Sequence, residues 1–523
     1  MSKEKTDNID YAEVAAKSQK QISVAEFFEK NRHLLGFDNP TRGLLTAVKE
    51  AVDNSLDACE DANILPEIYI EIIEMDDSRY RVIVEDNGPG IVKEQVSSIF
   101  GKLLYGSKFH KMKQSRGQQG IGISAAILYS QLTTGRDAKI ISKTKSKDKA
   151  LKLKLHIDTK TNKPVISSER ELSWNKEHGT SIELELEANY RKGKQSVDEY
   201  LREVAIVNPH ATITYVNPYA EQMIYTRAVN ELPEKPKEIK PHPHGIEFGK
   251  LISMLQVTNK RTLRSFLIDE FSRVGSNTAK DIIDSSGLES DFKPNELKRV
   301  AMDRLYKAMN KVDVSTPRTD CLSPIGEDKI LKGIKKETEA EFYHTVTRTP
   351  TVYRGNPFLV EVGLAYGGDL ESEGSIDIMR FANRVPLLYQ HGACAITKAV
   401  KQVNWKRYGL KQSGNNMPIG PMNVVAHIAS VWTPYTSEAK EAIAHYDGII
   451  KELKLALQEA GRKLKRYLSK KRSVQKEMKK RKFIEQYIPH ISSSIKNILD
   501  FGSNEELTIE ENLKEILEKN RGA

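Results

Sequence analysis

The chain has 523 residues, 39% of them hydrophobic and 29% charged, and a formal net charge of +10 at pH 7. This length allows about two to four domains with separate cores, and no apolar run approaches the roughly 20 residues of a membrane-spanning helix, so we expect no membrane partner. Three distant cysteines form no CxxC pair, and the start of the chain lacks the apolar segment of a signal peptide. We therefore expect a cytoplasmic protein without a disulfide framework or a zinc site.

The positive charge is concentrated in one segment. Residues 462–482 hold twelve Lys or Arg and one acid, Glu477, which gives a net charge of +11 and leaves −1 for the rest of the chain. A segment of this density usually faces a polyanion, although a solvated helix could have the same composition.

The first elements are predicted to be a flexible strap and two helices. Residues 1–22 form the strap, and Ser23 with Glu26 makes a capping box. Asn39 followed by Pro40 predicts a helix that runs to about Cys59. Its spacing predicts an apolar and a polar face, as in any surface helix. The apolar face holds Leu44, Leu45, Val48, Val52, Ser55 and Cys59, and the polar face holds Glu50, Asp53, Asn54 and Asp57.

Two alternating strands, 67–73 and 80–86, follow a short distance along the chain. The second strand leads Asp86 into the turn N-G-P-G, whose glycines permit close backbone approach. About thirty residues later the run R-G-Q-Q-G-I-G opens a helix, and glycine-rich backbone at a helix start is suited to holding phosphates. Further strands near 138–156 and 180–187 complete a first α+β or α/β domain, 23–238.

The remaining chain is expected to form two more domains and a tail. A linker rich in Pro and charge, 231–245, leads into an all-helical pattern within a second domain, 239–316. A third domain, 317–490, alternates strands with a helix near 394–407 and ends in a long helix from Ser437 to about residue 483. Residues 491–523 are expected to be an acidic C-terminal tail.

Single motifs of this kind are weak, but their order is specific. E-x-x-x-N on a helix, D-x-G-x-G after a strand, G-x-x-G-x-G before a helix and then G-T-S resemble the ATPase module shared by gyrase, Hsp90, MutL and sensor histidine kinases (GHKL). The segments GKLLYGSK, RGQQGIGISAAILYSQ, WKRY and TPYTSEAKEAI extend the resemblance, over roughly residues 20–490, to the topoisomerase VI B subunit family. The resemblance implies an α+β multidomain fold: a GHKL ATPase α/β sandwich, a helix-two-turn-helix domain and a transducer α/β domain with a long C-terminal helix.

The resemblance also implies ATP and Mg²⁺ as cofactors and assigns the site residues. Glu50 is the implied general base and Asn54 the magnesium ligand. Asp86 would hydrogen-bond the adenine amino group, with Thr180 nearby, and Lys440 would reach the terminal phosphate from the transducer. Asp53 and Asp57 are expected to be solvated or to lie behind these groups. The nucleotide would further contact Gly88, Gly90, Ser107, Lys108, Gly117, Gln118, Gln119, Gly120, Ile121 and Gly122.

The implied partners are duplex DNA, the topoisomerase VI A subunit, which cleaves DNA, and a second copy of the chain. Two B subunits would dimerise on ATP binding in an A2B2 heterotetramer associated with the nucleoid. The turn V-G-S-N-T of the helical domain resembles phosphate-gripping turns, although an ordinary helix connection is the alternative. The candidate DNA contacts are Arg273, Gly275, Ser276, Asn277 and Lys280 in this turn, and Lys470, Lys471 and Arg472 on the basic helix, which could instead meet the A subunit.

We therefore expect the ATP-hydrolysing subunit of a type II DNA topoisomerase that relaxes or decatenates DNA. The sequence has no D-x-D pair and no tyrosine in a recognisable cleavage context, so the double-strand break is expected on the A subunit. Two alternatives stay open at this point: a non-hydrolysing DNA-binding scaffold, and an Hsp90-like or MutL-like ATPase.

Overall fold

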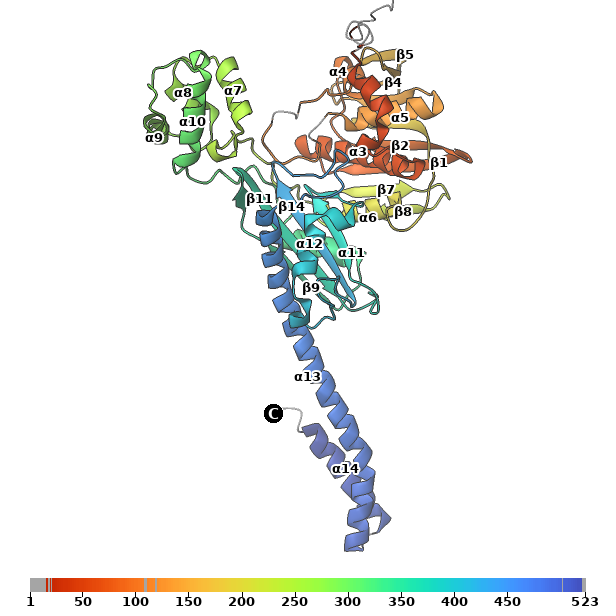
Figure 1. Ribbon diagram of the computed structural model, residues 1–523. Coiled ribbons are helices and arrows are strands. Elements are labelled where there is room, and N and C mark those ends of the chain that lie inside the picture. Colours follow the sequence, from red (N-terminus) through yellow and green to blue (C-terminus); the bar gives the residue numbers. More distant parts are fainter. Residues whose placement is uncertain are drawn as a thin grey trace, which may run out of the picture.

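The computed structural model describes residues 16, 19, 21–107, 111–117, 120–500 and 502–519 (Figure 1). Most of the expected strap, 1–22, lies outside these residues. The described chain forms an N-terminal α/β domain, a separate helical domain, a third α/β domain below the first, and a long helix that projects away from all three (Figure 1).

The N-terminal domain is built on a mixed eight-stranded sheet with the order β5-β4-β3-β6-β2-β1-β7-β8. Only β1 and β7 pair in parallel; the other neighbours are antiparallel. The strands are β1 (Glu67–Asp76), β2 (Arg79–Asp86), β3 (Ala138–Lys143), β4 (Ala150–Asp158), β5 (Lys163–Leu172), β6 (Gly179–Glu187), β7 (Thr212–Val216) and β8 (Gln222–Tyr225). The helices are α2 (Val24–Lys30), α3 (Pro40–Asp61), α4 (Lys93–Gly101), α5 (Gly122–Thr134) and α6 (Val197–Val207).

Helix α3 starts and ends close to where the sequence predicts. The side chain of Asn39 caps it, and Pro40 is its first residue. The alternative of an ordinary surface helix is excluded, because twelve of its residues are buried, including Asp53 and Asp57 on the expected polar face. The helix packs between the sheet, α5 and α6, and partners from those elements replace the water that these carboxylates would otherwise need.

The helical domain contains α7 (Phe248–Val257), α8 (Leu263–Glu270), α9 (Ser276–Ser286) and α10 (Arg299–Lys311), in agreement with the all-helical prediction for 246–312. It has its own apolar core, which includes Leu251, Phe266, Ile282 and Leu305. In Figure 1 it lies beside the N-terminal domain and is joined to it by the extended linker.

The third domain is a six-stranded sheet in which β11 pairs with β9, β10 and β14, and β14 also pairs in parallel with β12. Its long buried strands β11 and β14 agree with two strands that the sequence predicts in this domain, FLVEVGLAYGG and NVVAHIASVW. The elements are α11 (Glu327–Glu337), β9 (Phe342–Thr347), β10 (Thr351–Tyr353), β11 (Asn356–Tyr366), β12 (Asp377–Ala382), β13 (Val385–Pro386), α12 (Ala395–Gln402) and β14 (Met422–Ser430).

The long helix α13 (Asp447–Leu499) begins ten residues later than predicted and runs further, through Pro489. Its first turns pack on the third domain's sheet, where glycines allow close contact: a Cβ at Gly461 would meet the ring of Tyr408. Beyond Arg472 it leaves the domain, and α14 (Ser503–Lys519) folds back beside it (Figure 1). No helix among the described residues is long and apolar enough to span a membrane.

Candidate active site

A cavity of about 560 Å³ lies between α3, the end of β2, the glycine-rich loop before α5, and a loop of the third domain. Nearly all predicted nucleotide residues meet here, although they come from segments 390 residues apart. The lining includes Glu50, Asn54, Asp86, Gly90, Ser107, Gly117, Gly120, Ile121, Gly122, Thr180 and Lys440. Lys108, Gln118 and Gln119 lie outside the described residues.

Asp86 sits at the carboxyl end of β2 and is buried. Its Oδ1 accepts hydrogen bonds from the backbone N–H groups of Gly88 (2.8 Å) and Thr180 (3.1 Å). Gly88 itself does not line the cavity, so its contribution is this donor. Burial raises the pKa of Asp86, while these bonds oppose that rise. A carboxylate offers about four acceptor positions, so the group is fixed in place and can still accept a bond from an amino group in the cavity.

Ser55 is the functional residue that sequence reasoning missed. Its hydroxyl donates to Asp86 Oδ2 at 2.9 Å, and the residue lines the cavity. The helical wheel assigned Ser55 to the apolar face together with Cys59. The signal in the sequence was a single serine on an otherwise apolar helix face, which indicates that its hydroxyl needs a polar partner.

Glu50 and Gly122 are packed against each other. Glu50 is half-buried on α3 and lines the cavity, and Gly122 is the first residue of α5. A Cβ added at Gly122 would overlap the carboxylate of Glu50. Only glycine at position 122 therefore leaves the carboxylate in its place beside the helix start.

Replacing Gly122 with alanine is expected to slow ATP hydrolysis about tenfold, because the new methyl group displaces Glu50. A misplacement of about 1 Å can cost ~10²-fold, and the flexible glutamate side chain absorbs part of it. Steady-state ATPase assays would measure the change. Gly249→Ala is the matched control, since a Cβ there meets nothing within 4 Å. Equal rates for the two variants would contradict the packing argument.

Asn54 is exposed to the cavity one turn beyond Glu50. Its Oδ1 lies 3.9 Å from the position a Cβ would take at Gly117, so the amide reaches the glycine-rich loop. Among the described residues, no group of three or more His, Cys, Asp or Glu side chains could hold a metal ion. A single amide oxygen fits Mg²⁺, which keeps several waters and is commonly bound together with substrate phosphates.

Lys440 enters the cavity from the third domain. It lies in the loop after β14, has a left-handed backbone (φ 54°) and is buried. Its Nζ donates to the carbonyl oxygen of Arg116 at 3.0 Å, next to Gly117. Burial would lower the pKa of Lys440, but Glu50, Tyr435 and Asp53 together raise it, so the ammonium stays charged.

The loop that carries Lys440 is held on α3. Lys49 donates to the carbonyl oxygen of Ala439 at 3.1 Å, and Arg42 forms an ion pair with Glu441. These contacts explain why 437–446 is a loop here, although its sequence predicts the start of a helix.

Asp53 and Asp57 are both buried, so of the two environments expected for them, solvated or behind the site groups, the structure excludes the first. Asp57 also lines the cavity. Tyr200 donates to Asp53 Oδ1 at 3.1 Å, and Arg116 pairs with Asp57 Oδ1 at 2.8 Å. Burial raises the pKa of Asp53 to about 6.

The DNA candidates lie far from the cavity. Arg273, Gly275, Ser276, Asn277 and Lys280 are all exposed where α8 turns into α9, and Gly275 precedes the first turn of α9. Arg273 also donates to the carbonyl oxygen of Thr316. On α13, Lys470 is exposed, whereas Lys471 pairs with Glu341 and Arg472 donates to Gly409.

Three archaeal relatives match nearly the whole chain. The B subunit of type 2 DNA topoisomerase 6 from Methanosarcina acetivorans is 52% identical over 94% of this chain and 79% of its own length. The protein of the same description from Archaeoglobus fulgidus is 52% identical over 92% and 80%. That from Natronomonas pharaonis is 38% identical over 97% and 86%. The chain belongs to the topoisomerase VI B subunit family.

Two family profiles agree with this membership. Residues 43–182 match the histidine kinase-, DNA gyrase B- and HSP90-like ATPase family, and residues 317–481 match the topoisomerase VI B subunit transducer. The chain therefore carries the ATPase module and the transducer of an ATP-dependent type II DNA topoisomerase. Among solved structures, the B-subunit of the DNA gyrase from Myxococcus xanthus aligns with 84% of this chain and 95% of that chain, at 10% identity and a TM-score of 0.42.

Proposed function

We propose that the cavity binds and hydrolyses ATP in the following way. Asp86 receives the adenine amino group, and the backbone of Gly117, Gly120 and Gly122 faces the phosphates. Glu50 accepts a proton from the attacking water, for which its position beside the start of α5 is suited. Asn54 is the residue that would hold Mg²⁺, which neutralises phosphate charge when bound. The convergence of these groups on one cavity is the observation that carries the proposal.

Lys440 connects this chemistry to the transducer. It is the cation that the third domain places in the cavity, so its contact with a terminal phosphate would exist before hydrolysis and disappear afterwards. A ligand shifts a conformational equilibrium only through such differential contacts. The ATP-bound state would hold two B subunits together as a dimer that encloses a DNA duplex, and product release would reopen it.

The partners we propose are the topoisomerase VI A subunit, duplex DNA and a second copy of this chain, in a nucleoid-associated A2B2 assembly. Support for a protein partner comes from the projecting hairpin of α13 and α14 (Figure 1), because large apolar side chains are exposed on it. They include Met478 (65% exposed), Phe483 (60%), Tyr487 (50%) and Ile498 (79%). Exposed apolar clusters of this kind are typical of interaction sites. For the chain itself we propose an ATPase domain, 23–238, a helix-two-turn-helix domain, 239–316, and a transducer, 317–490, followed by an acidic tail.

The basic segment of α13 provides a test of DNA contact. Replacing the exposed Lys470, Lys476, Lys479 and Lys480 with glutamine should weaken duplex binding and flatten its salt dependence, by about 0.9 in slope for each phosphate contact that the variant no longer makes. Titrations at several salt concentrations would measure this. Four exposed lysines of the ATPase domain (Lys145, Lys147, Lys149 and Lys194) give a charge-matched control. An unchanged slope together with a failure to bind the A subunit would assign the segment to the protein partner instead.

ATPase activity of the chain with and without duplex DNA, and with and without the A subunit, tests the function as a whole. We expect hydrolysis that rises in the presence of DNA and strand passage that requires both subunits. The absence of hydrolysis under every condition would favour the non-hydrolysing scaffold. Family membership argues against the Hsp90-like and MutL-like alternative.

A further inference from the structure

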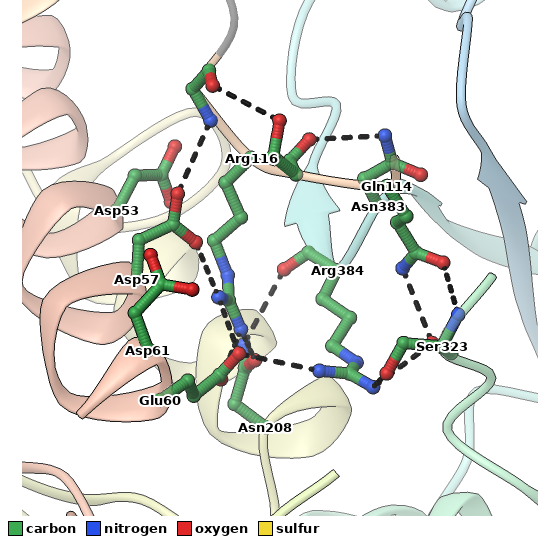
Figure 2. Close-up of polar contacts among 12 residues, drawn as sticks. Asp53, Asp57, Glu60, Asp61, Gln114, Arg116, Asn208, Ser323, Asn383 and Arg384 are labelled. Carbon is green, nitrogen blue, oxygen red and sulfur yellow. Dashed lines mark hydrogen bonds and ion pairs between the residues drawn. The ribbon is translucent and has the colours of Figure 1, made fainter. Parts of the chain in front are cut away.

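The guanidinium of Arg116, which directly precedes the glycine-rich Gly117, is buried in a cluster behind the cavity (Figure 2). It pairs with Asp57 at 2.8 Å and with Glu60 at 2.6 Å, both on α3. The side chain of Asn208, after α6, also accepts a hydrogen bond from it. Arg116 therefore ties residues 114–117, which we call the nucleotide loop, to α3 and to the end of α6.

Glu60 is shared between this loop and the transducer. Its Oε2 lies 3.0 Å from Arg116 Nη1 and 3.5 Å from Arg384 Nη1, and its Oε1 accepts from His210 at 2.8 Å. Burial would raise the pKa of Glu60, but Arg116, His210 and Arg384 hold it well below its usual range. One carboxylate thus stands between two buried guanidinium groups that come from different domains (Figure 2).

Arg384 has a backbone conformation that its residue type does not favour. Asn383 (φ 49°) and Arg384 (φ 65°) form the two-residue turn between β12 and β13, and both are left-handed. Such turns prefer Asn followed by Gly. An arginine persists in this conformation where its surroundings hold it, and here Arg384 donates to the hydroxyl and the carbonyl oxygen of Ser323, at 2.7 and 2.9 Å.

Neutral hydrogen bonds reinforce the contact of Glu60, Arg116 and Arg384 between the ATPase domain and the transducer, which we call the junction. Asn383 donates to the carbonyl oxygen of Ser115 at 3.1 Å. Gln114 exchanges two hydrogen bonds with the backbone of Ser323, at 3.2 and 2.7 Å. Residues 114–116 of the nucleotide loop are therefore bound on one side by the transducer and on the other by α3.

Arg116 also joins this cluster to the loop 437–446 of the transducer, because its carbonyl oxygen is the acceptor for Lys440. We propose that Glu60, Arg116 and Arg384 are positioning residues: they hold the end of the nucleotide loop in register with the transducer, so that Lys440 and Gly117 meet the terminal phosphate together. This inference rests on the proposed ATP function. It adds to the Lys440 loop a further polar connection between the ATPase domain and the transducer, formed by side chains that do not touch the nucleotide.

The junction should affect the binding of ATP and of ADP differently, because only ATP has a terminal phosphate for Lys440 and Gly117 to contact. ADP has no terminal phosphate, so its affinity depends on the Asp86 end of the cavity and not on the junction. An ATP analogue needs Lys440 and the nucleotide loop in register. Loss of the junction should thus lower the affinity for the analogue and leave that for ADP unchanged, whereas a merely structural role would weaken both.

The test compares R384G, R384K and the unaltered chain, with binding of ADP and of a non-hydrolysable ATP analogue measured by calorimetry. Glycine suits the left-handed turn, so R384G removes the guanidinium without backbone strain. We expect analogue affinity to fall about tenfold, within the usual range of coupling between sites, and ADP affinity to stay within about twofold of the unaltered value. R384K should recover part of the loss, because it keeps a cation opposite Glu60 without the planar fork.

Arg348→Ala is the control, since Arg348 pairs with Glu452 and Glu459 inside the transducer and should leave the ADP-to-analogue ratio unchanged. If R384G does not fold, Gln114→Ala breaks the same junction from the loop side and should change the ratio in the same direction. If these variants keep the same ratio of ADP affinity to analogue affinity as the unaltered chain, the inference is overturned and the proposed function is not. An unaltered chain that binds neither nucleotide would overturn the proposed function and, with it, this inference.

Discussion

Glu50→Gln is expected to reduce ATP turnover by about 10²–10⁴-fold, the range that a positioned general base contributes. The substitution keeps the size of the side chain and its place beside Gly122, and it removes only the proton acceptor. Nucleotide binding should therefore persist, because Asp86 and the glycine-rich loop are untouched. Phosphate release under saturating ATP would measure turnover, and equilibrium titration with the same nucleotide would measure binding.

Glu94→Gln provides the matched control. Glu94 is exposed on α4 and does not line the cavity, so the same chemical change there should leave turnover unaffected. Turnover of the Glu50 variant within twofold of the unaltered chain would exclude Glu50 as the base. A large loss of binding would instead give Glu50 a role in holding the nucleotide.

The sequence predicted most of the elements that surround this cavity, because they are regular. Strand β2 alternates throughout between buried and more exposed positions, β1 does so over its first seven residues, and α3 has both an Asn cap and a starting proline. Strand β5 was missed. It lies at the edge of the sheet, eight of its ten residues are exposed, and its sequence KPVISSEREL has no apolar period to detect.

The sequence was least informative where residues from other elements determine the environment of a side chain. The sequence left open whether Asp53 and Asp57 are solvated, because nothing in the helix shows that Tyr200 and Arg116 reach them from other elements. The junction of Glu60, Arg116 and Arg384 escaped sequence reasoning for the same reason, since its members are 56 and 268 residues apart along the chain. The left-handed turn at Asn383 and Arg384 also gives no local signal, because arginine rarely adopts this conformation.

Lys440→Ala is expected to leave ADP binding unchanged and to slow ATP hydrolysis by about 10²–10³-fold, comparable to the loss of one preorganised donor at a developing charge. The structure explains why no neighbouring cation can take over the role of Lys440. The backbone of Lys440 is left-handed, which costs about 1–2 kcal/mol for a residue other than glycine, and the loop is held on α3 through Lys49 and Arg42. No other lysine or arginine of the described chain lines the cavity.

The consequence of this substitution for shape separates a switch from a simple phosphate ligand. In the unaltered chain, a non-hydrolysable ATP analogue and ADP should give different dimensions in small-angle scattering, because Lys440 draws the transducer toward the nucleotide only when a terminal phosphate is present. In the Lys440→Ala chain the two nucleotides should give the same dimensions. Lys451→Ala, exposed near the start of α13, should retain the difference. If the Lys440 variant also retains it, the shape change must reach the transducer by another route, and the junction of Glu60, Arg116 and Arg384 is one such connection, beside the apolar packing of α6 on α11.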